Sequence, residues 1–379
     1  MRRQQERIGF MRRALAVAGA LALLAGTAGA DVTTERSASI LVFPKVISTA
    51  TRDTIVQITN TNNSMVHAHC IYVNGALGPN PNPLLPPVPV WTELDFDIWL
   101  TRQQPTVWIA SAGRPANPTD APCDPTVTAC YGAGIDPGFV PPVPVDFTGE
   151  LKCIEVDSSV VPTAGNHLKG EATLVDTVTG DVAKYNGIGI LADPDRLNDD
   201  NFLCLGGAES ENCPDGAEYN GCPNIWVLNH FSEGALDPIA ENAGAAGSSS
   251  VNTEITVVPC TEDFENRTPT AVTLQFLVTN EFETTFSAST TVTCWGNTTL
   301  EDINSSAFTR AALNTDFAQT RIRAVGEGGV LLVAEEFHSA TIPAGGVART
   351  ASAAVNAHVE GERAGQDLIT LQPDLRTEP

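Results

Sequence analysis

The sequence predicts an all-β fold of antiparallel strands, and three observations support this prediction. Valine, isoleucine, threonine and phenylalanine alternate with polar residues, and proline and glycine separate these runs. No long stretch has the repeat of about 3.6 residues that an amphipathic helix needs. Residues 94–100 and 272–278 place every second, apolar side chain on one face of a strand. We therefore expect half-buried antiparallel strands.

The pattern of residues 1–30 predicts an export signal that is cleaved after Ala30. Arginines precede the apolar run Ala14–Gly26, and the small residues Ala28, Gly29 and Ala30 follow it. At about 1.5 Å per residue the run is about 20 Å long, shorter than the ~30 Å hydrocarbon core of a bilayer. We expect a secreted or periplasmic protein with no membrane span after cleavage; a retained membrane anchor is the alternative.

The charge balance restricts the partners. The formal net charge is −24, and removal of the export signal changes it to −28 because five arginines and one glutamate are lost. Such a chain repels nucleic-acid phosphates and anionic lipid headgroups, so we expect neither as a partner. The charge suits Ca²⁺, a cationic surface or solubility alone, of which solubility is the commonest explanation. A protein or glycan at the cell surface is a possible partner.

Two segments of the sequence resemble each other and predict two related modules. Ile40–Pro44 resembles Ile255–Pro259, and each is followed by a strand, a Thr-Asn pair and a second strand ending near a cysteine. About 350 mature residues also exceed what one core usually serves. We predict two β-sandwich domains, at 31–192 and 251–372. The other segments are an export signal at 1–30, an acidic cysteine-containing insertion and linker at 193–250, and a tail at 373–379.

The spacing of these strands resembles the immunoglobulin-like sandwiches that are common in secreted bacterial proteins. The resemblance is at the level of the fold and rests on no family motif. It implies two immunoglobulin-like antiparallel β-sandwich domains, an internal duplication, and long irregular loops that provide binding surfaces.

The chain has nine cysteines, which fits an oxidising compartment where disulfides persist. The odd number leaves one thiol over or available to another chain. The strand faces predict the pairs Cys70–Cys153 and Cys260–Cys294. Cys123 and Cys130 bracket a short loop and are expected to bridge each other. For Cys204, Cys213 and Cys222 we expect one disulfide and one free thiol; a zinc site is the alternative, although close Cys-x-x-Cys pairs are missing.

His67 and His69 are the strongest candidates for a functional site. Residues two apart on a strand point to the same side, so both imidazoles are expected to face outward, opposite Cys70. This pair is a suitable start of a copper or zinc site. A third ligand could come from Asp95, Asp97, His167 or His230. The alternative is two solvent-facing histidines on a sheet.

Two further sets of residues suggest ligands. Oxygen donors for Ca²⁺ are concentrated in one acidic loop that contains Asp193, Asp195, Asp199 and Asp200; a solvated loop is the alternative. Exposed aromatic rings could bind a glycan or a protein partner, and the candidates are Trp91, Trp99 and Trp108. Singly exposed or edge-packed tryptophans are the alternative.

No catalytic motif is evident, because the sequence lacks a nucleophile elbow, a phosphate-binding loop and a dinucleotide fingerprint. An enzyme is therefore disfavoured but stays open. The leading hypothesis is a secreted, non-catalytic structural, adhesion or binding protein of the cell envelope or extracellular space. The alternatives are a copper- or zinc-binding periplasmic protein that uses His67 and His69, and a carbohydrate-binding module.

Overall fold

The computed structural model describes most of the chain after the predicted export signal. The described residues are 32–80, 83–84, 87–115, 136–196, 200–242, 244, 249–326, 328–342, 347–360 and 366–372. The predicted export signal at 1–30, Cys123, Cys130, Asp199 and the tail at 373–379 lie outside the described residues.

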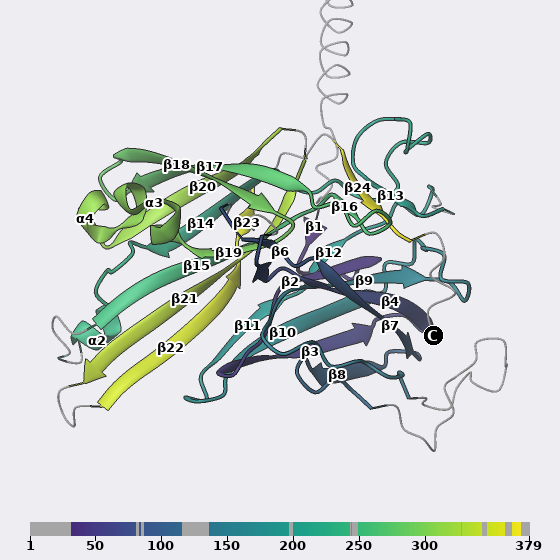
Figure 1. Cartoon of the computed structure of the whole chain (residues 1–379), viewed down its shortest axis with the longest axis horizontal. Helices are drawn as coiled ribbons and strands as arrows, with labels where there is room; N and C mark the ends of the chain where they lie inside the picture. The colour runs from purple at the N-terminus through teal and green to yellow at the C-terminus, as the bar shows by residue number, and fades with distance from the viewer. Residues whose placement is uncertain are drawn as a thin grey trace, which may run out of the picture. The chain divides into compact units, whose positions relative to one another are not determined.

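The first half of the described chain forms two sheets and a short ribbon (Figure 1). Six strands form the larger sheet, in the order β1 (Val32–Thr33), β12 (Ile188–Ile190), β2 (Ile40–Ser48), β9 (Phe147–Val156), β4 (Val66–Asn74) and β7 (Thr92–Leu100). A four-stranded sheet has the order β11 (Val182–Asn186), β10 (Leu168–Asp176), β3 (Arg52–Asn60) and β8 (Pro105–Ile109). The ribbon pairs β5 (Leu77–Gly78) with β6 (Val88–Pro89).

The second half contributes three more sheets. The five-stranded sheet has the order β18 (Thr285–Thr293), β17 (Ala271–Asn280), β20 (Phe317–Val325), β14 (Ile225–Phe231) and β23 (His358–Val359). Another four-stranded sheet contains β19 (Gly296–Thr299), β15 (Ser249–Pro259), β21 (Val330–Ile342) and β22 (Val347–Asn356). The three-stranded sheet contains β13 (Phe202–Leu205), β24 (Asp367–Thr370) and β16 (Glu262–Asp263), with β16 parallel to β24.

Three short helices complete the described structure: α2 (Pro238–Asn242), α3 (Leu300–Phe308) and α4 (Arg310–Leu313). The hydroxyl of Thr299 accepts a hydrogen bond from the backbone N–H of Asp302 and caps α3, and Thr309 caps α4 in the same way. Among the described residues, no helix is long and apolar enough to cross a membrane.

The predicted pair of immunoglobulin-like sandwich domains is wrong. The described part of the chain is all-β as expected, with 57% strand and 6% helix, but its small antiparallel sheets are arranged as a five-bladed β-propeller. Five of the described sheets have three or more strands, whereas two sandwiches would have four sheets. Residues 31–379 also form one compact unit.

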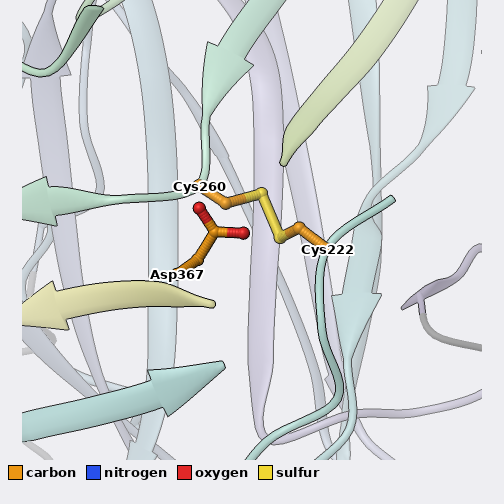
Figure 2. A group of neighbouring side chains, drawn as sticks. All are labelled: Cys222, Cys260 and Asp367. Atoms are coloured by element: carbon orange, nitrogen blue, oxygen red, sulfur yellow. A yellow bond between two sulfur atoms is a disulfide. The ribbon is translucent and has the colours of Figure 1, made fainter. Parts of the chain in front are cut away.

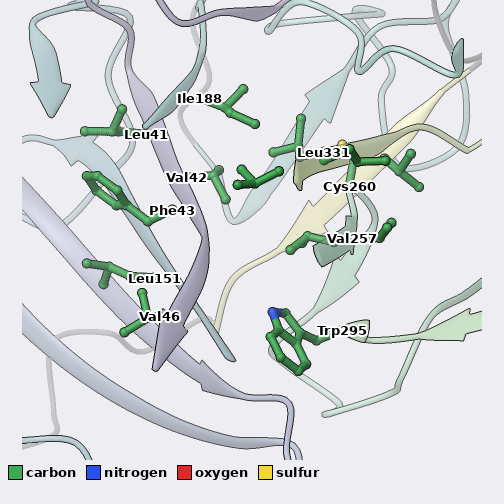
Figure 3. Packing of buried hydrophobic residues seen from close by; sticks show 14 of the residues in the cluster. Leu41, Val42, Phe43, Val46, Leu151, Ile188, Val257, Cys260, Trp295 and Leu331 are labelled. Atoms are coloured by element: carbon green, nitrogen blue, oxygen red, sulfur yellow. The ribbon is translucent and has the colours of Figure 1, made fainter. Parts of the chain in front are cut away.

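Burial of the six-stranded sheet gives the physical reason for this difference. An immunoglobulin-like sheet leaves one face to solvent, but all nine residues of β2 and the first eight of β4 are buried. Leu41 and Phe43 of β2 lie on one side with Leu151 (Figure 3). Val42 points to the other side, toward Val257, Leu331 and Trp295 of the second half. Both faces of this sheet therefore contribute to the core.

The segment expected to be an insertion and linker, 193–250, contains β13, β14 and α2. β14 is an inner strand of the five-stranded sheet, where it pairs with β20 and β23. The repeated motifs do form strands, β2 and β15, but the strands after them pair differently. β17 pairs with its successor β18, whereas β3 and β4 belong to separate sheets. The two segments therefore do not share one topology.

Three disulfides join the described cysteines. Cys70 is bonded to Cys153, the partner expected from the sequence, and Cys204 is bonded to Cys213. The expected pair Cys260–Cys294 is wrong, because Cys260 at the end of β15 is bonded to Cys222. Cys294 is a buried free thiol. It lies in the turn after β18 with a positive φ of 61°, and its N–H donates to the carbonyl of Thr270.

Candidate functional site

The candidate site is formed where β4 pairs with the edge strand β7. In this register His69 lies opposite Asp97, and His67 lies opposite Trp99. The alternation of a strand directs both histidines away from the side of Cys70, as the spacing predicts. The expected solvent exposure is wrong, because His67 is 5% and His69 is 3% exposed.

One carboxylate joins the two imidazoles. Oδ1 of Asp97 lies 2.9 Å from Nε2 of His67 and 3.1 Å from Nδ1 of His69. The other ring nitrogen of His67, Nδ1, lies 2.8 Å from the backbone carbonyl oxygen of Asp157. The ring of His67 also stacks on Trp99, with centroids 3.6 Å apart. Asp97, with 41% of its side chain exposed, connects this pair of buried rings to the surface.

The hydrogen bonds determine where the proton of His67 lies. A backbone carbonyl can only accept, so Nδ1 of His67 carries the proton and donates it to Asp157. A neutral ring would then direct the lone pair of Nε2 at the carboxylate of Asp97. A proton or a metal ion between Nε2 of His67 and Oδ1 of Asp97 would make this contact favourable.

Asp97 is held as an anion. Burial alone would raise its pKa, but the hydrogen bonds from His67 and His69 outweigh burial and lower the pKa well below its usual range. The Nε2 atom of His69 is buried and has no hydrogen-bond partner in the described part of the chain. An anionic oxygen and two imidazole nitrogens are ligand types that Zn²⁺ and Cu²⁺ accept. His67, His69 and Asp97 are not among the described groups whose three ligand atoms all lie within 4.8 Å of one another, so the two rings would have to approach each other for one ion to bind all three groups.

Of the four additional donors suggested by the sequence, the structure brings Asp97 to the histidines. Asp95 lies two residues away on β7, opposite Ile71. His167 is engaged elsewhere, because its Nδ1 lies 2.7 Å from the carboxylate of Glu155. His230 is buried, and its Nε2 lies 2.8 Å from the hydroxyl of Thr320.

A second cluster of charged groups, which the sequence analysis missed, lies deeper in the same sheet. Lys152 of β9 contacts the carboxylate of Glu262 in β16, and its Nζ lies 3.6 Å from Oε1 of Glu150. All three side chains are at most 2% exposed. In the strand Phe147–Val156, Glu150 and Lys152 alternate with Leu151 and Cys153, a pattern that ordinarily indicates a solvent-facing side.

Cys222, Cys260 and Asp367 place three potential ligand atoms within 4.8 Å of one another. Figure 2 shows the two sulfur atoms joined as a disulfide beside the carboxylate, so neither is a thiolate ligand. Asp367 accepts hydrogen bonds from the hydroxyl of Thr261 and the N–H of Gly329. Burial raises its pKa to about 6. The disulfide joins the segment before β14 to the end of β15, beside the first residue of β24.

The tryptophans do not form the expected exposed face. Trp91 is 8% exposed and stacks on Phe264, and Trp108 is 3% exposed and donates from Nε1 to the hydroxyl of Tyr72. Trp99 is half-buried against His67. Because buried rings cannot stack on a sugar, the structure removes the basis for a carbohydrate-binding surface on Trp91 and Trp108.

In the described part of the acidic loop, carboxylates accept hydrogen bonds from backbone N–H groups of the same loop. Asp193 accepts a hydrogen bond from the N–H of Asp195 and contacts Arg196, and Asp200 accepts from the N–H of Phe202. These carboxylates are not among the described groups that place three ligand atoms within coordinating distance. The calcium site at Asp193, Asp195, Asp199 and Asp200 stays a prediction.

The sequence matches no known protein-family model, and no curated protein matches it significantly. The function is therefore inferred from the chemistry of the described residues.

Proposed function

We propose that this chain is a non-catalytic binding protein of the periplasm or extracellular space, and that it binds a copper or zinc ion through His67, His69 and Asp97. The observation that carries the proposal is the single oxygen of Asp97 within hydrogen-bond distance of a nitrogen from each imidazole. Three disulfides and the predicted export signal support an oxidising compartment.

The surroundings of His67 support this role. Metal-binding histidines almost always donate their second ring N–H to a carbonyl or carboxylate, which orients the ring and makes the coordinating nitrogen more basic. His67 makes this bond to the carbonyl of Asp157. Stacking on Trp99 further restricts the ring, so Nε2 is directed at Asp97 before a ligand arrives.

Metal binding to protein purified without an affinity tag tests the proposal. The protein is stripped with a chelator, dialysed, and titrated separately with Zn²⁺ and Cu²⁺ by calorimetry. We expect one ion per chain, and Cu²⁺ should show nitrogen ligands in its electron paramagnetic resonance spectrum. Asp97→Ala and His69→Ala should each weaken binding at least tenfold.

His358→Ala is the matched control, because His358 is exposed and lies on β23 in another sheet. This variant should bind as the wild type does. Circular dichroism of each variant checks that the fold is retained. Absence of binding by the folded wild type, or equal affinity of the wild type and Asp97→Ala, would refute the assignment of a metal ion to this site.

A further inference from the structure

We propose that Lys152 and Glu262 form an intramolecular amide bond, with Glu150 as the proton-transferring group. Lys152 lies at the centre of the six-stranded sheet on β9, and Glu262 lies on β16 in the three-stranded sheet. The bond would join two sheets through residues that are 110 positions apart in the sequence. This inference is independent of the metal site.

The contacts place a nucleophile, an acyl group and an acid side by side. Nζ of Lys152 contacts the carboxyl group of Glu262, and Glu150 lies 3.6 Å from the same Nζ. Nζ of Lys152 and both carboxylate oxygens of Glu262 have no hydrogen-bond partner among the described residues. Two reacting groups held in contact in this way react as if at very high concentration.

The cluster is dry and partly apolar. Lys152, Glu150 and Glu262 are 2%, 0% and 1% exposed, and the ring centroid of Phe264 lies 5.4 Å from the amine. An ion pair in such a place loses its hydration, and the attraction between the charges offsets this loss only if further hydrogen bonds complete the pair. An amide bond removes both charges, and with them this cost.

The protonation states suit the reaction. Burial lowers the pKa of Lys152, which favours the neutral and nucleophilic amine. Burial also raises the pKa of Glu150, although Lys152 opposes the shift, so Glu150 is held as an acid that can donate a proton.

A second buried lysine shows what an ordinary ion pair looks like in the same protein. Nζ of Lys45 donates a hydrogen bond to Glu254 and lies 2.8 Å from Oε2 of Glu335. Arg52 supplies a further cation to Glu335. This network has two cations for two carboxylates, whereas the cluster around Lys152 has one cation for two carboxylates.

The reaction balances without an oxidant or a cofactor. A proton passes from the Lys152 ammonium to the Glu262 carboxylate, and the free amine then attacks Cδ of Glu262 to form the C–N bond. Glu150 donates a proton to the departing oxygen and recovers one from the nitrogen. The C–O bond breaks, one water molecule leaves, and Glu150 is protonated before and after the reaction.

Peptide mapping of the full chain tests the bond directly. The protein is denatured, reduced, alkylated and digested with trypsin and a glutamate-specific protease. We expect a branched peptide that contains Lys152 and Glu262 and is lighter than the sum of its parts by one water. Trypsin should fail to cut after Lys152 but should cut after Lys45, the internal control for a buried lysine in an ion pair.

Three variants distinguish the proposed amide bond between Lys152 and Glu262 from a non-covalent contact. Lys152→Arg keeps the positive charge but should give no branched peptide, whereas Glu262→Gln should give the wild-type branched peptide because ammonia leaves instead of water. Lys184→Arg, at an exposed pair with Glu171, is the matched control and should leave the cross-link intact. Recovery of Lys152 and Glu262 from the folded wild type in separate linear peptides of unmodified mass would overturn the proposal, whatever the variants do.

Discussion

Glu233, just after β14, should make the stability of this protein depend on pH. Its carboxyl accepts a hydrogen bond from the N–H of Thr253, and it is 3% exposed. Burial raises its pKa from 4.5 to about 8, and the nearby carboxylates of Glu301, Asp302 and Glu336 add to the shift. Folding therefore retains a proton that the unfolded chain releases between these two pH values.

The sign and size of the effect follow from this shift. Stability falls as pH rises from 4.5 toward 8, and each pH unit within this window costs about 1.4 kcal/mol. Glu233→Gln keeps an oxygen that can accept from Thr253 but cannot ionise. At pH 7 the variant should be more stable than the wild type by about 3 kcal/mol, and the two should converge near pH 4.5.

Urea unfolding of both proteins from pH 4.5 to 8 measures this difference, since groups that titrate in both proteins cancel. Glu265→Gln is the control, because Glu265 is exposed, and its curve should parallel that of the wild type. A constant difference between Glu233→Gln and the wild type across this range would refute the assignment of the buried proton to Glu233.

Three further predictions follow from packing and covalent structure. Replacing Cys70 and Cys153 by serine opens a loop with a sequence separation of 83 and should lower the free energy of unfolding in urea by about 4.5 kcal/mol. Replacing Cys204 and Cys213, with a separation of 9, should lower it by about 2.7 kcal/mol. Equal losses would contradict the loop-entropy argument. Gly75→Ala would place its Cβ 2.6 Å from the side chain of Trp295. The free energy of unfolding should therefore fall by about 1–3 kcal/mol, and the melting temperature should fall with it. An unchanged melting temperature would show that Trp295 can move aside. Burial raises the pKa of the Cys294 thiol to about 12, so a thiol reagent at pH 8 should label the Cys294 peptide after denaturation and not before; rapid labelling of the native protein would place the thiol at the surface.

Local patterns predicted strands and their faces well, because alternation reports burial on one side of a strand. Phe96, Ile98 and Leu100 on β7, and Leu274 and Phe276 on β17, are buried as expected. The pairing of strands was not predictable, because it depends on contacts between distant segments. β14 shows the difficulty: residues 225–231 have a strand-like composition, yet they were assigned to a linker by their acidic and glycine-rich neighbours.

The candidate site was predictable in part for the same reason. The spacing of His67 and His69 correctly put them on one side of β4, and Asp97 was among the expected third donors. Their burial was not predictable, since it depends on how distant segments cover the sheet. Glu150 and Lys152 were missed because a charged residue at every second position ordinarily marks a solvated face.

The position of Lys152 beside Cys153 has a mechanical consequence. Cys153 is bonded to Cys70 on the neighbouring strand, while Glu262 lies two residues from Cys260, which is bonded to Cys222. With the proposed amide in place, a tensile load applied between β4 and the segment around Cys222 would be carried by covalent bonds alone. The sheets between these points would then be joined by a continuous covalent path in addition to their non-covalent contacts.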